Sequence, residues 1–335
     1  ALEPHLQAFS GMSGVTGNQG DDGQLVRFTH LDPTGAVFFC GLIMLGLIER
    51  ERFGHSCWVK TSHLANALAN MNNKVSEVLL ANSPSKPLGS GSSTSAPNRC
   101  YICEDKRYIA VSCENQSQWL GFCNALELND LVEDIRFLSN TDRVKNRSEL
   151  DEILENHFLQ KPTRWWSLRL DKENVPNSFD LCFDDLQFHQ QIVENDFLVE
   201  VDGEHTGPFF VGGLPWEFSE TPAKIDTSIP VPGKETENAI NRGFESSSKK
   251  TVETESESPE YPLKGIRVLD ISQGYTGPYL SFMLAEAGAE VTKIEPIGGD
   301  WSKKLSPQTK NGMSALYQSF NRNKEIIEMD IQSES

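Results

Sequence analysis

Residues 266–288 have the composition of a turn that binds an anionic ligand. A run of β-branched and aliphatic residues ends at Asp270, the sequence SQGYTGP follows, and an amphipathic helix is closed by Gly288. Glycines in such a turn let backbone amides approach a ligand, and the N-terminus of the following helix favours negative charge. The spacing is not G-x-G-x-x-G, so a tight turn without a ligand is the alternative.

Basic side chains gather after this turn. Between Lys293 and Lys324, lysine and arginine outnumber acidic residues by six to two. The bases are Lys293, Lys303, Lys304, Lys310, Arg322 and Lys324, and the acids are Glu295 and Asp300. A net charge of +4 within a chain of formal charge −18 suits a polyphosphate ligand. A basic face that only meets solvent is the alternative.

Other reactive residue types give weaker signals. Cys100 and Cys103 form a Cys-x-x-Cys pair, but no second pair follows at zinc-like spacing, so we expect a β-hairpin and no metal. His30 and His55 flank a long apolar segment, and a histidine beside Asp32 could serve acid–base catalysis. Packing or surface positions are the more ordinary role for both. A serine hydrolase is excluded because the chain has no G-x-S-x-G motif.

Helices must position the candidate residues of the N-terminal half. A short helix is expected to end near Gly11. A long helix is predicted from an N-cap at Asp32, with Pro33 at its first position, to Gly54, which follows its last turn. Its interior is apolar all round, so we expect it to be buried on most faces. A second helix with an apolar stripe is predicted over residues 62–81.

The rest of the chain alternates short elements with loops. Composition predicts an exposed loop over 82–98, a hairpin around Glu104-Asp105-Lys106, helices near 115–125, 129–137, 146–159 and 162–171, short strands over 175–222, and a polar linker over 226–260. After the linker, residues 266–295 predict a βαβ unit with parallel strands, and a third strand follows near residue 326.

Length and composition set the class of the protein. A chain of 335 residues predicts roughly two domains, and 38% apolar with 23% charged residues is typical of a soluble globular protein. The acidic charge argues against nucleic-acid binding. Seven cysteines without a dense framework favour a reducing compartment. No basic-then-apolar leader is visible, and the apolar run over 36–48 is shorter than the ~20 residues of a membrane span, so a cytoplasmic location is expected.

Several motifs then carry a resemblance to a known family. The segments PLKGIRVLDIS, LAEAGAEVTKIEP and NRNKEIIEMDI resemble the N-terminal signature of class III CoA-transferases of the formyl-CoA/carnitine type. The segments QAFSGMSGVTG, DPTGAVFFCGLIMLGLIERERFG, WLGFCNALEL and PWEFSETP resemble the remainder of the same kind of domain. The resemblance implies an α/β fold, with a Rossmann-like large domain and a smaller α+β domain over about 55–200, incomplete in this chain.

The order of these motifs implies a tandem protein. Residues 1–222 would be the C-terminal part of a first repeat, 223–260 a flexible linker, and 261–335 the N-terminal βαβ part of a second repeat. Family members form interlocked dimers, so the resemblance implies a homodimer or intramolecular pairing of repeats. Fused pairs also resemble enzymes that transfer CoA to dimethylsulfoniopropionate and release dimethyl sulfide, leaving a three-carbon acyl-CoA.

The resemblance implies an acyl-CoA:carboxylate CoA-transferase with an aspartate nucleophile. Asp32 occupies the family's aspartate position, although Gly35 and Ala36 stand in swapped order. The implied sequence runs through a mixed anhydride and an aspartyl-CoA thioester to a new acyl-CoA. A coenzyme A thioester and a small carboxylic acid would be the substrates, with no tightly bound cofactor, metal, nucleic acid or membrane. Asp32 could alternatively only cap its helix.

Further site residues follow from the same resemblance. Gly274, Tyr275 and Thr276 would lie against the thioester end of CoA, with Tyr275 replacing a small or amide side chain. Lys303 stands where the family tends to place arginine, which keeps the charge and loses the bidentate fork. The segment Gly89-Ser90-Gly91 resembles the mobile glycine loop over the reacting carbonyl.

Two other functions fit the same fold. The first repeat could be a non-catalytic scaffold that pairs with the second. An acyl-CoA racemase is the other alternative, because it deprotonates the carbon next to the thioester. That reaction needs a His/Asp acid–base pair, so it would give His30 a role.

Overall fold

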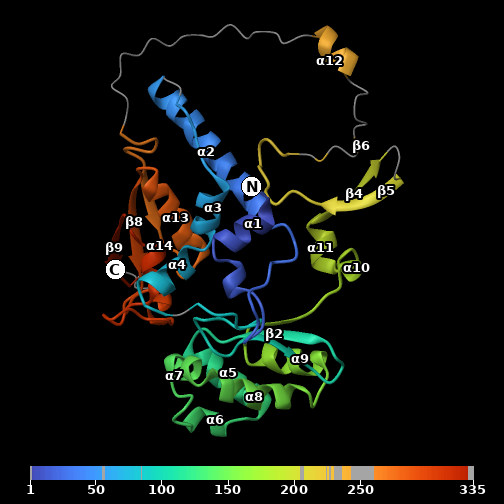
Figure 1. Ribbon diagram of the computed structural model, residues 1–335, viewed down its shortest axis with the longest axis vertical. Coiled ribbons are helices and arrows are strands. Elements are labelled where there is room, and N and C mark those ends of the chain that lie inside the picture. The colour runs from blue at the N-terminus through green and yellow to red at the C-terminus, as the bar shows by residue number, and fades with distance from the viewer. Residues whose placement is uncertain are drawn as a thin grey trace. The chain divides into compact units, whose positions relative to one another are not determined.

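The computed structural model describes residues 2–54, 57–83, 85–203, 207–223, 225, 228–229, 236–242 and 260–330 (Figure 1). His55 and most of the predicted linker lie outside these residues. The chain divides into two compact units, each of which is treated by itself. One comprises Ala1–Phe179 with Val252–Ser335, and the other comprises Asp180–Thr251.

A parallel sheet organises the C-terminal part of the first unit. The strands β7 (Arg267–Asp270), β8 (Glu290–Glu295) and β9 (Lys324–Glu328) lie in that order, and both neighbouring pairs are parallel. Helix α13 (Thr276–Glu286) connects β7 to β8. Two elements that were not predicted, the 3-10 helix η2 (Trp301–Lys304) and α14 (Ala315–Phe320), lie between β8 and β9. The predicted α/β class and the parallel βαβ unit are confirmed.

Helices form the N-terminal part of the same unit. They are α1 (Glu3–Phe9), the 3-10 turn η1 (Ser13–Val15), α2 (Leu31–Phe53), α3 (His63–Asn70) and α4 (Asn72–Leu79). The single helix predicted over 62–81 is therefore wrong, because Met71 separates two helices. The predicted end of α2 is confirmed, since Gly54 adopts the left-handed conformation that glycine tolerates best. The N-cap of α2 is His30, so the predicted N-cap role of Asp32 is wrong.

The surroundings of α2 contradict its predicted burial. Only Leu31 and Gly35 of this helix are buried, and six of its large apolar side chains are exposed among the described residues. The exposed ones are Val37, Phe39, Ile43, Met44, Leu47 and Ile48. Within the described residues, α2 alone is long and apolar enough to cross a membrane by length and composition, which is weak evidence because core helices pass the same test. The apolar composition of a helix on all its faces therefore does not show that other residues of the same chain cover it.

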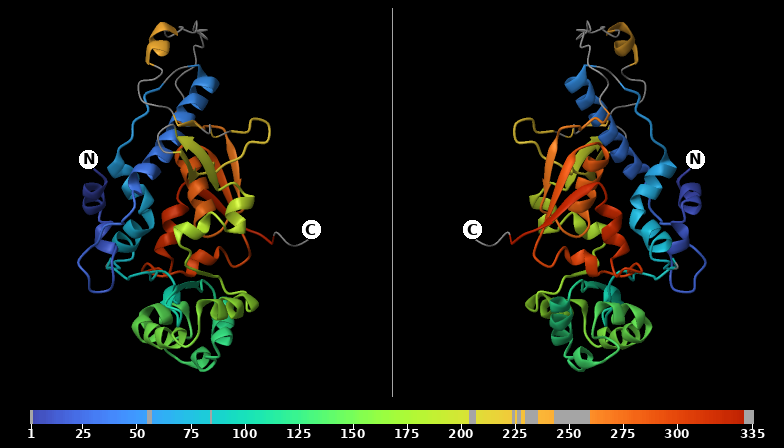
Figure 2. Two further views of the ribbon diagram at one scale, coloured as in Figure 1. Left: turned by 90° about the vertical axis from the view of Figure 1, so that its right-hand side faces the viewer. Right: turned by 90° about the vertical axis from the view of Figure 1, so that its left-hand side faces the viewer.

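The sheet and the N-terminal helices pack together within the unit. Arg52 at the end of α2 donates to the backbone carbonyl of Pro262 at 2.9 Å. On α4, the side-chain amide of Asn72 donates to the carbonyl of Ser319 at 2.8 Å. Figure 2 shows the orange and red elements of this sheet beside the blue and cyan helices. Residues 260–330 therefore share one compact unit with residues 2–179, and the predicted division into two repeats stays a prediction.

A separate hydrophobic core lies between residues 96 and 175. The antiparallel strands β1 (Asn98–Ile102), β2 (Tyr108–Ser112) and β3 (Asn177–Phe179) accompany five helices. These are α5 (Gln116–Leu126), α6 (Asp130–Glu133), α7 (Asn140–Lys145), α8 (Arg147–Phe158) and α9 (Thr163–Lys172). Trp119, Phe122 and Trp166 are among its buried side chains. The predicted hairpin and four of the helices are confirmed, and α7 was not predicted.

The second unit contains short elements. They are α10 (Phe183–Leu186), α11 (Gln190–Glu194), β4 (Leu198–Gly203), β5 (Gly207–Gly212), β6 (Ser228–Ile229) and α12 (Thr236–Arg242). Strand β4 pairs with β5 antiparallel and with β6 parallel. The strands predicted over 175–222 are present, but α10 and α11 lie between them.

Candidate active site

Asp32 lies in the first turn of α2 with its side chain exposed. The backbone beneath it is held by a carboxylate from another helix. Glu3 of α1 accepts hydrogen bonds from the backbone N–H of His30 at 2.6 Å and of Asp32 at 3.2 Å. The first N–H groups of a helix have no partner within the helix, so Glu3 satisfies donors that would otherwise need water. The position of Asp32 therefore depends on Glu3.

Glu3 is buried, with 7% of its surface exposed. Burial alone would raise its pKa, but the backbone N–H groups of His30 and its neighbours, with the Gln7 amide, lower the pKa to about 2. Gln7 donates to Glu3 at 2.9 Å and accepts from the backbone N–H of Val26 at 2.8 Å. Sequence reasoning missed this role. The only local signal is a Glu and a Gln four residues apart, which says nothing of the distant backbone that they bind.

A histidine lies beside Asp32, but it is not the one the sequence suggested. The Nδ1 atom of His63 is 3.8 Å from Oδ1 of Asp32, and both side chains are about half exposed. His63 is the first residue of α3, next to the place where α2 carries Gly35. The ring of His30 instead meets Phe28 edge-on, with 5.9 Å between ring centroids. Only the crossing of α2 and α3 brings His63 to Asp32, so no sequence spacing could have found it.

The turn after β7 is tied to the interior of the sheet. Gly274 is buried with φ +82°, and a Cβ atom there would lie 2.5 Å from the Trp301 ring, so this position requires glycine. Its backbone N–H donates to the carboxylate of Asp300 at 3.2 Å. The backbone N–H of Gly274, which the sequence suggested for ligand binding, is therefore hydrogen-bonded within the protein. Thr276, the first residue of α13, is exposed.

Tyr275 contacts Thr94, which follows the glycine loop of residues 89–91. Tyr275 packs on Phe320 with ring centroids 6.3 Å apart. Burial raises the pKa of its phenol, and a hydrogen bond with Thr94 partly offsets that effect. In the loop, Gly89 donates its N–H to the carbonyl of Gly17 at 2.7 Å. Tyr275 therefore contacts the segment that follows the glycine loop.

The other loop residues have partners as well. The Ser90 hydroxyl accepts from the backbone N–H of Cys100 at 3.0 Å, and Gly91 donates its N–H to the carbonyl of Leu88 at 3.0 Å. The loop is thus tethered at Gly89, Ser90 and Gly91 in this conformation.

Three of the six bases in the cluster, Lys293, Lys303 and Lys324, pair with carboxylates inside the protein, whereas the sequence suggested a polyphosphate ligand or, alternatively, solvent. Lys293 is fully buried and donates to Asp300 at 2.6 Å. Lys303 binds Glu295 at 2.5 Å, and Glu295 is itself fully buried. Burial would raise the pKa of the Asp300 carboxyl, but its bonds to Lys293 and Ser302 hold that pKa below its ordinary range. A charge count along the sequence could not reveal that these bases face carboxylates.

Two further members of the cluster also pair with acids, Lys324 in the interior and Arg322 at the surface. The Lys324 amine lies 3.3 Å from Asp270, and burial lowers the pKa of Lys324 to about 8. Arg322 pairs with Glu286 at 2.8 Å. Lys304 and Lys310 are exposed.

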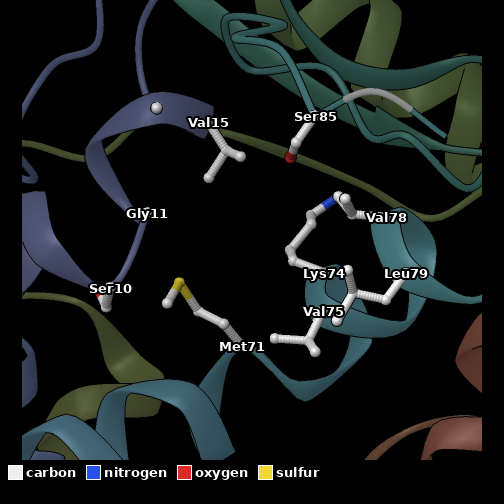
Figure 3. Close-up of a pocket in the computed structure, with 10 residues that line it drawn as sticks. Ser10, Gly11, Val15, Met71, Lys74, Val75, Val78, Leu79 and Ser85 are labelled. Carbon is white, nitrogen blue, oxygen red and sulfur yellow. The ribbon is translucent and has the colours of Figure 1, made fainter. Parts of the chain in front are cut away.

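A pocket of about 290 Å³ lies elsewhere in the unit (Figure 3). Its apolar lining comes from Val75, Val78 and Leu79 of α4, with Met71 and Val15, and none of the predicted site residues lines it. Lys74 at its edge pairs with Glu77 at 2.9 Å and also binds Ser93. Because that amine is already neutralised, the pocket offers little to an anionic ligand.

The predicted site residues do not form one contact network. Among the described residues, no hydrogen bond or ion pair joins Asp32 to Lys303 or to residues 89–91 and 274–276. The described residues also contain no group of three or more His, Cys, Asp or Glu side chains that could hold a metal. The structure therefore places the exposed carboxylate of Asp32 beside the imidazole of His63. The buried carboxylate of Glu3 holds the backbone of Asp32.

Comparison with known proteins identifies the family to which the chain belongs. A sequence model of CoA-transferase family III matches residues 1–236 and 263–335. Succinyl-CoA:glutarate CoA-transferase of Mus musculus is 24% identical over 233 residues, which are 70% of this chain and 53% of that protein. Acetyl-CoA:oxalate CoA-transferase of Acetobacter aceti is 28% identical over 178 residues, which are 52% of this chain and 45% of that protein. The chain thus spans about half the length of these curated relatives.

Solved structures share the fold at low sequence identity. Rv3272 from M. tuberculosis matches with a TM-score of 0.60 and 21% identity, over 71% of this chain and 63% of that chain. A CAIB/BAIF family protein from Brucella suis matches with a TM-score of 0.58 and 21% identity, over 72% and 62%. The family match covers both the helices around Asp32 and the parallel sheet. This chain belongs to CoA-transferase family III.

Proposed function

We propose that the protein transfers coenzyme A from an acyl-CoA to a small carboxylic acid, with Asp32 as the nucleophile. The observation that carries the proposal is an exposed carboxylate whose backbone is fixed by Glu3, in a chain of this family. An exposed carboxylate can reach a thioester, and a fixed backbone limits the directions from which it attacks.

The proposed reaction has four balanced steps. An oxygen of Asp32 attacks the thioester carbonyl, the C–S bond breaks, and a mixed anhydride and CoA thiolate form. The thiolate attacks the Asp32 carbonyl and releases the donor acid, leaving an aspartyl-CoA thioester. The acceptor carboxylate then displaces the thiolate to form a second anhydride. Attack of the thiolate on the acceptor carbonyl gives the new acyl-CoA and restores Asp32.

The names of the relatives define the first substrates to test. They carry succinyl-CoA, acetyl-CoA, glutarate and oxalate in their names. Dimethylsulfoniopropionate belongs in the same panel as an acceptor, because β-elimination from its CoA ester would release dimethyl sulfide. Detection of that gas during turnover would support the finer proposal. Transfer to dicarboxylates without gas release would restrict the protein to CoA transfer.

Kinetics of Asp32→Asn test the nucleophile in the full-length protein. The side-chain amide cannot form the anhydride, so we expect kcat to fall by at least about a thousandfold. Asp22→Asn is the matched control, because Asp22 is also exposed and lies outside the site. It should retain activity within about twofold. Equal activity of the two variants would reject Asp32 as the nucleophile.

A second candidate function has one observation in its favour. The His63 and Asp32 pair could serve the proton transfers of an acyl-CoA racemase. Exchange of the hydrogen next to the thioester with deuterium oxide, in the absence of an acceptor acid, would support this activity. Transfer without exchange would reject it.

A further inference from the structure

His63 is held in place by the close approach of α2 and α3. A Cβ atom at Gly35 would lie 3.1 Å from Nδ1 of His63 and 3.2 Å from Nδ2 of Asn66. The missing side chain at Gly35 therefore leaves the room that the imidazole occupies. Asn66 is buried and accepts a hydrogen bond from the Thr61 hydroxyl at 2.9 Å, which fixes this side of the crossing.

A hydrogen bond also joins α2 to α3 directly. The side-chain amide of Asn70 on α3 donates to the Thr34 hydroxyl on α2 at 2.9 Å. Glycine at position 35 thus leaves room for a histidine next to the proposed nucleophile.

The charged groups around His63 leave its imidazole facing Asp32. On α2, Asp32 is within ion-pair distance at 3.8 Å, too far for a hydrogen bond. On α1, the carboxylate of Glu3 is already bound to backbone N–H groups. Both His63 and Asp32 are about half exposed, so a small ligand can reach the space beside them.

We propose that His63 binds the acceptor carboxylate after Asp32 has been acylated. This inference rests on the proposed function. The free Asp32 carboxylate lies within ion-pair distance of the His63 ring and repels a second anion. Acylation converts that carboxylate into a neutral anhydride or thioester, which no longer repels an anion. The acceptor carboxylate then takes the place beside the His63 ring.

The location suits the chemistry of the second half-reaction. One oxygen of the acceptor accepts a hydrogen bond from His63, and the other faces the Asp32 carbonyl carbon, where the new bond forms. No bond to His63 is made or broken in this step. His63 would therefore act in acceptor binding and would not be required for the first acylation.

The test separates the two half-reactions in the full-length protein. Acylation of Asp32 is measured by rapid quench and peptide mass spectrometry with succinyl-CoA or acetyl-CoA alone. The acceptor KM is measured with the best substrate among glutarate, oxalate and dimethylsulfoniopropionate. For His63→Gln, which replaces the imidazole with an uncharged amide, we expect the acceptor KM to rise about tenfold or more, without a fall in the acylation rate.

Three further variants make the test specific. His63→Lys keeps a cation and should restore the acceptor KM to within about threefold of wild type. Gly35→Ala places a methyl group against the imidazole and should raise the acceptor KM in the same direction as His63→Gln. His5→Gln changes an exposed histidine on α1 and should do neither.

The outcomes distinguish this inference from the proposed function. An unchanged acceptor KM in His63→Gln, with normal acylation, would overturn the inference alone. A fall in the acylation rate of His63→Gln, in proportion to the rise in its acceptor KM, would also overturn the inference. An acceptor KM that His63→Lys does not restore would do the same. Failure of the wild-type protein to acylate Asp32 would overturn the proposed function and this inference together.

Discussion

At the scale of single residues, the position of Asp32 follows from a carboxylate that the chemistry itself does not use. Glu3 is buried, carries charge-assisted hydrogen bonds to the first backbone N–H groups of α2, and has a pKa of about 2. It acts as a cap supplied from another helix. Asp32, the proposed nucleophile, is exposed, and a different acid satisfies the helix end.

Replacement of Glu3 by Gln tests this role through its pH dependence. The folded-state pKa lies below the ordinary 4.5, so the stabilisation is fully present above that pH and is lost as pH falls through about 2. We expect the variant to lose about 2 kcal/mol of unfolding free energy at pH 7. The deficit should shrink as the pH approaches 3, as measured by urea denaturation.

Glu152→Gln is the control for that comparison, because Glu152 is an exposed acid on α8. It should change stability by less than about 0.5 kcal/mol at either pH. A deficit for Glu3→Gln that is equal at pH 7 and pH 3 would contradict the role of the Glu3 charge.

At the scale of elements, the parallel sheet holds the turn before α13 through buried charges. Asp300 accepts from both Lys293 and the backbone N–H of Gly274. Lys293 of β8 therefore helps to hold the turn through Asp300. The sequence counts bases and acids correctly, but only tertiary packing shows that they meet in the interior.

Replacement of Lys293 by Met should destabilise the protein strongly. It leaves the Asp300 carboxylate buried without its cation, whereas Glu295 keeps Lys303, and the loss costs about 3–5 kcal/mol. Lys310→Met removes an exposed lysine of the same cluster and should cost less than about 0.5 kcal/mol. Thermal and urea denaturation of both variants would measure this, and a similar stability for the two would argue against the buried network.

Sequence patterns predicted local features of the structure but not contacts between distant segments. Local signals sufficed for the βαβ unit, for the hairpin at 98–112 and for Gly54 after α2, because turn residues and apolar periodicity act within a few residues. The contacts of Glu3 and His63 with Asp32 could not be predicted from spacing. They arise where helices cross, and neither histidine chosen from the sequence was His63.

At the scale of the whole molecule, α2 presents an apolar surface. Val37 is 73% exposed and Met44 is 51% exposed, although the helix composition is typical of a core. Contiguous apolar surface of this kind marks interaction sites. A homodimer or intramolecular pairing of repeats, as expected from the sequence, would cover it. The chain spans about half the length of its curated relatives, so the tandem organisation stays a prediction.

Charged substitutions on α2 test that expectation in the full-length protein. We expect Val37→Asp with Met44→Asp to weaken self-association in sedimentation velocity, or to lower the melting temperature if the pairing is intramolecular. Leu168→Asp is the matched control, because Leu168 is 62% exposed on α9. It should do neither. Identical behaviour of the two proteins would exclude α2 as a docking surface.

The most direct measurement is hydroxylamine trapping of the full-length protein during turnover of an acyl-CoA with its acceptor. We expect the peptide that contains Asp32 to carry a hydroxamate, and the Asp32→Asn protein to carry none. Turnover that leaves Asp32 unmodified, with the hydroxamate on another carboxylate, would contradict covalent catalysis at this residue.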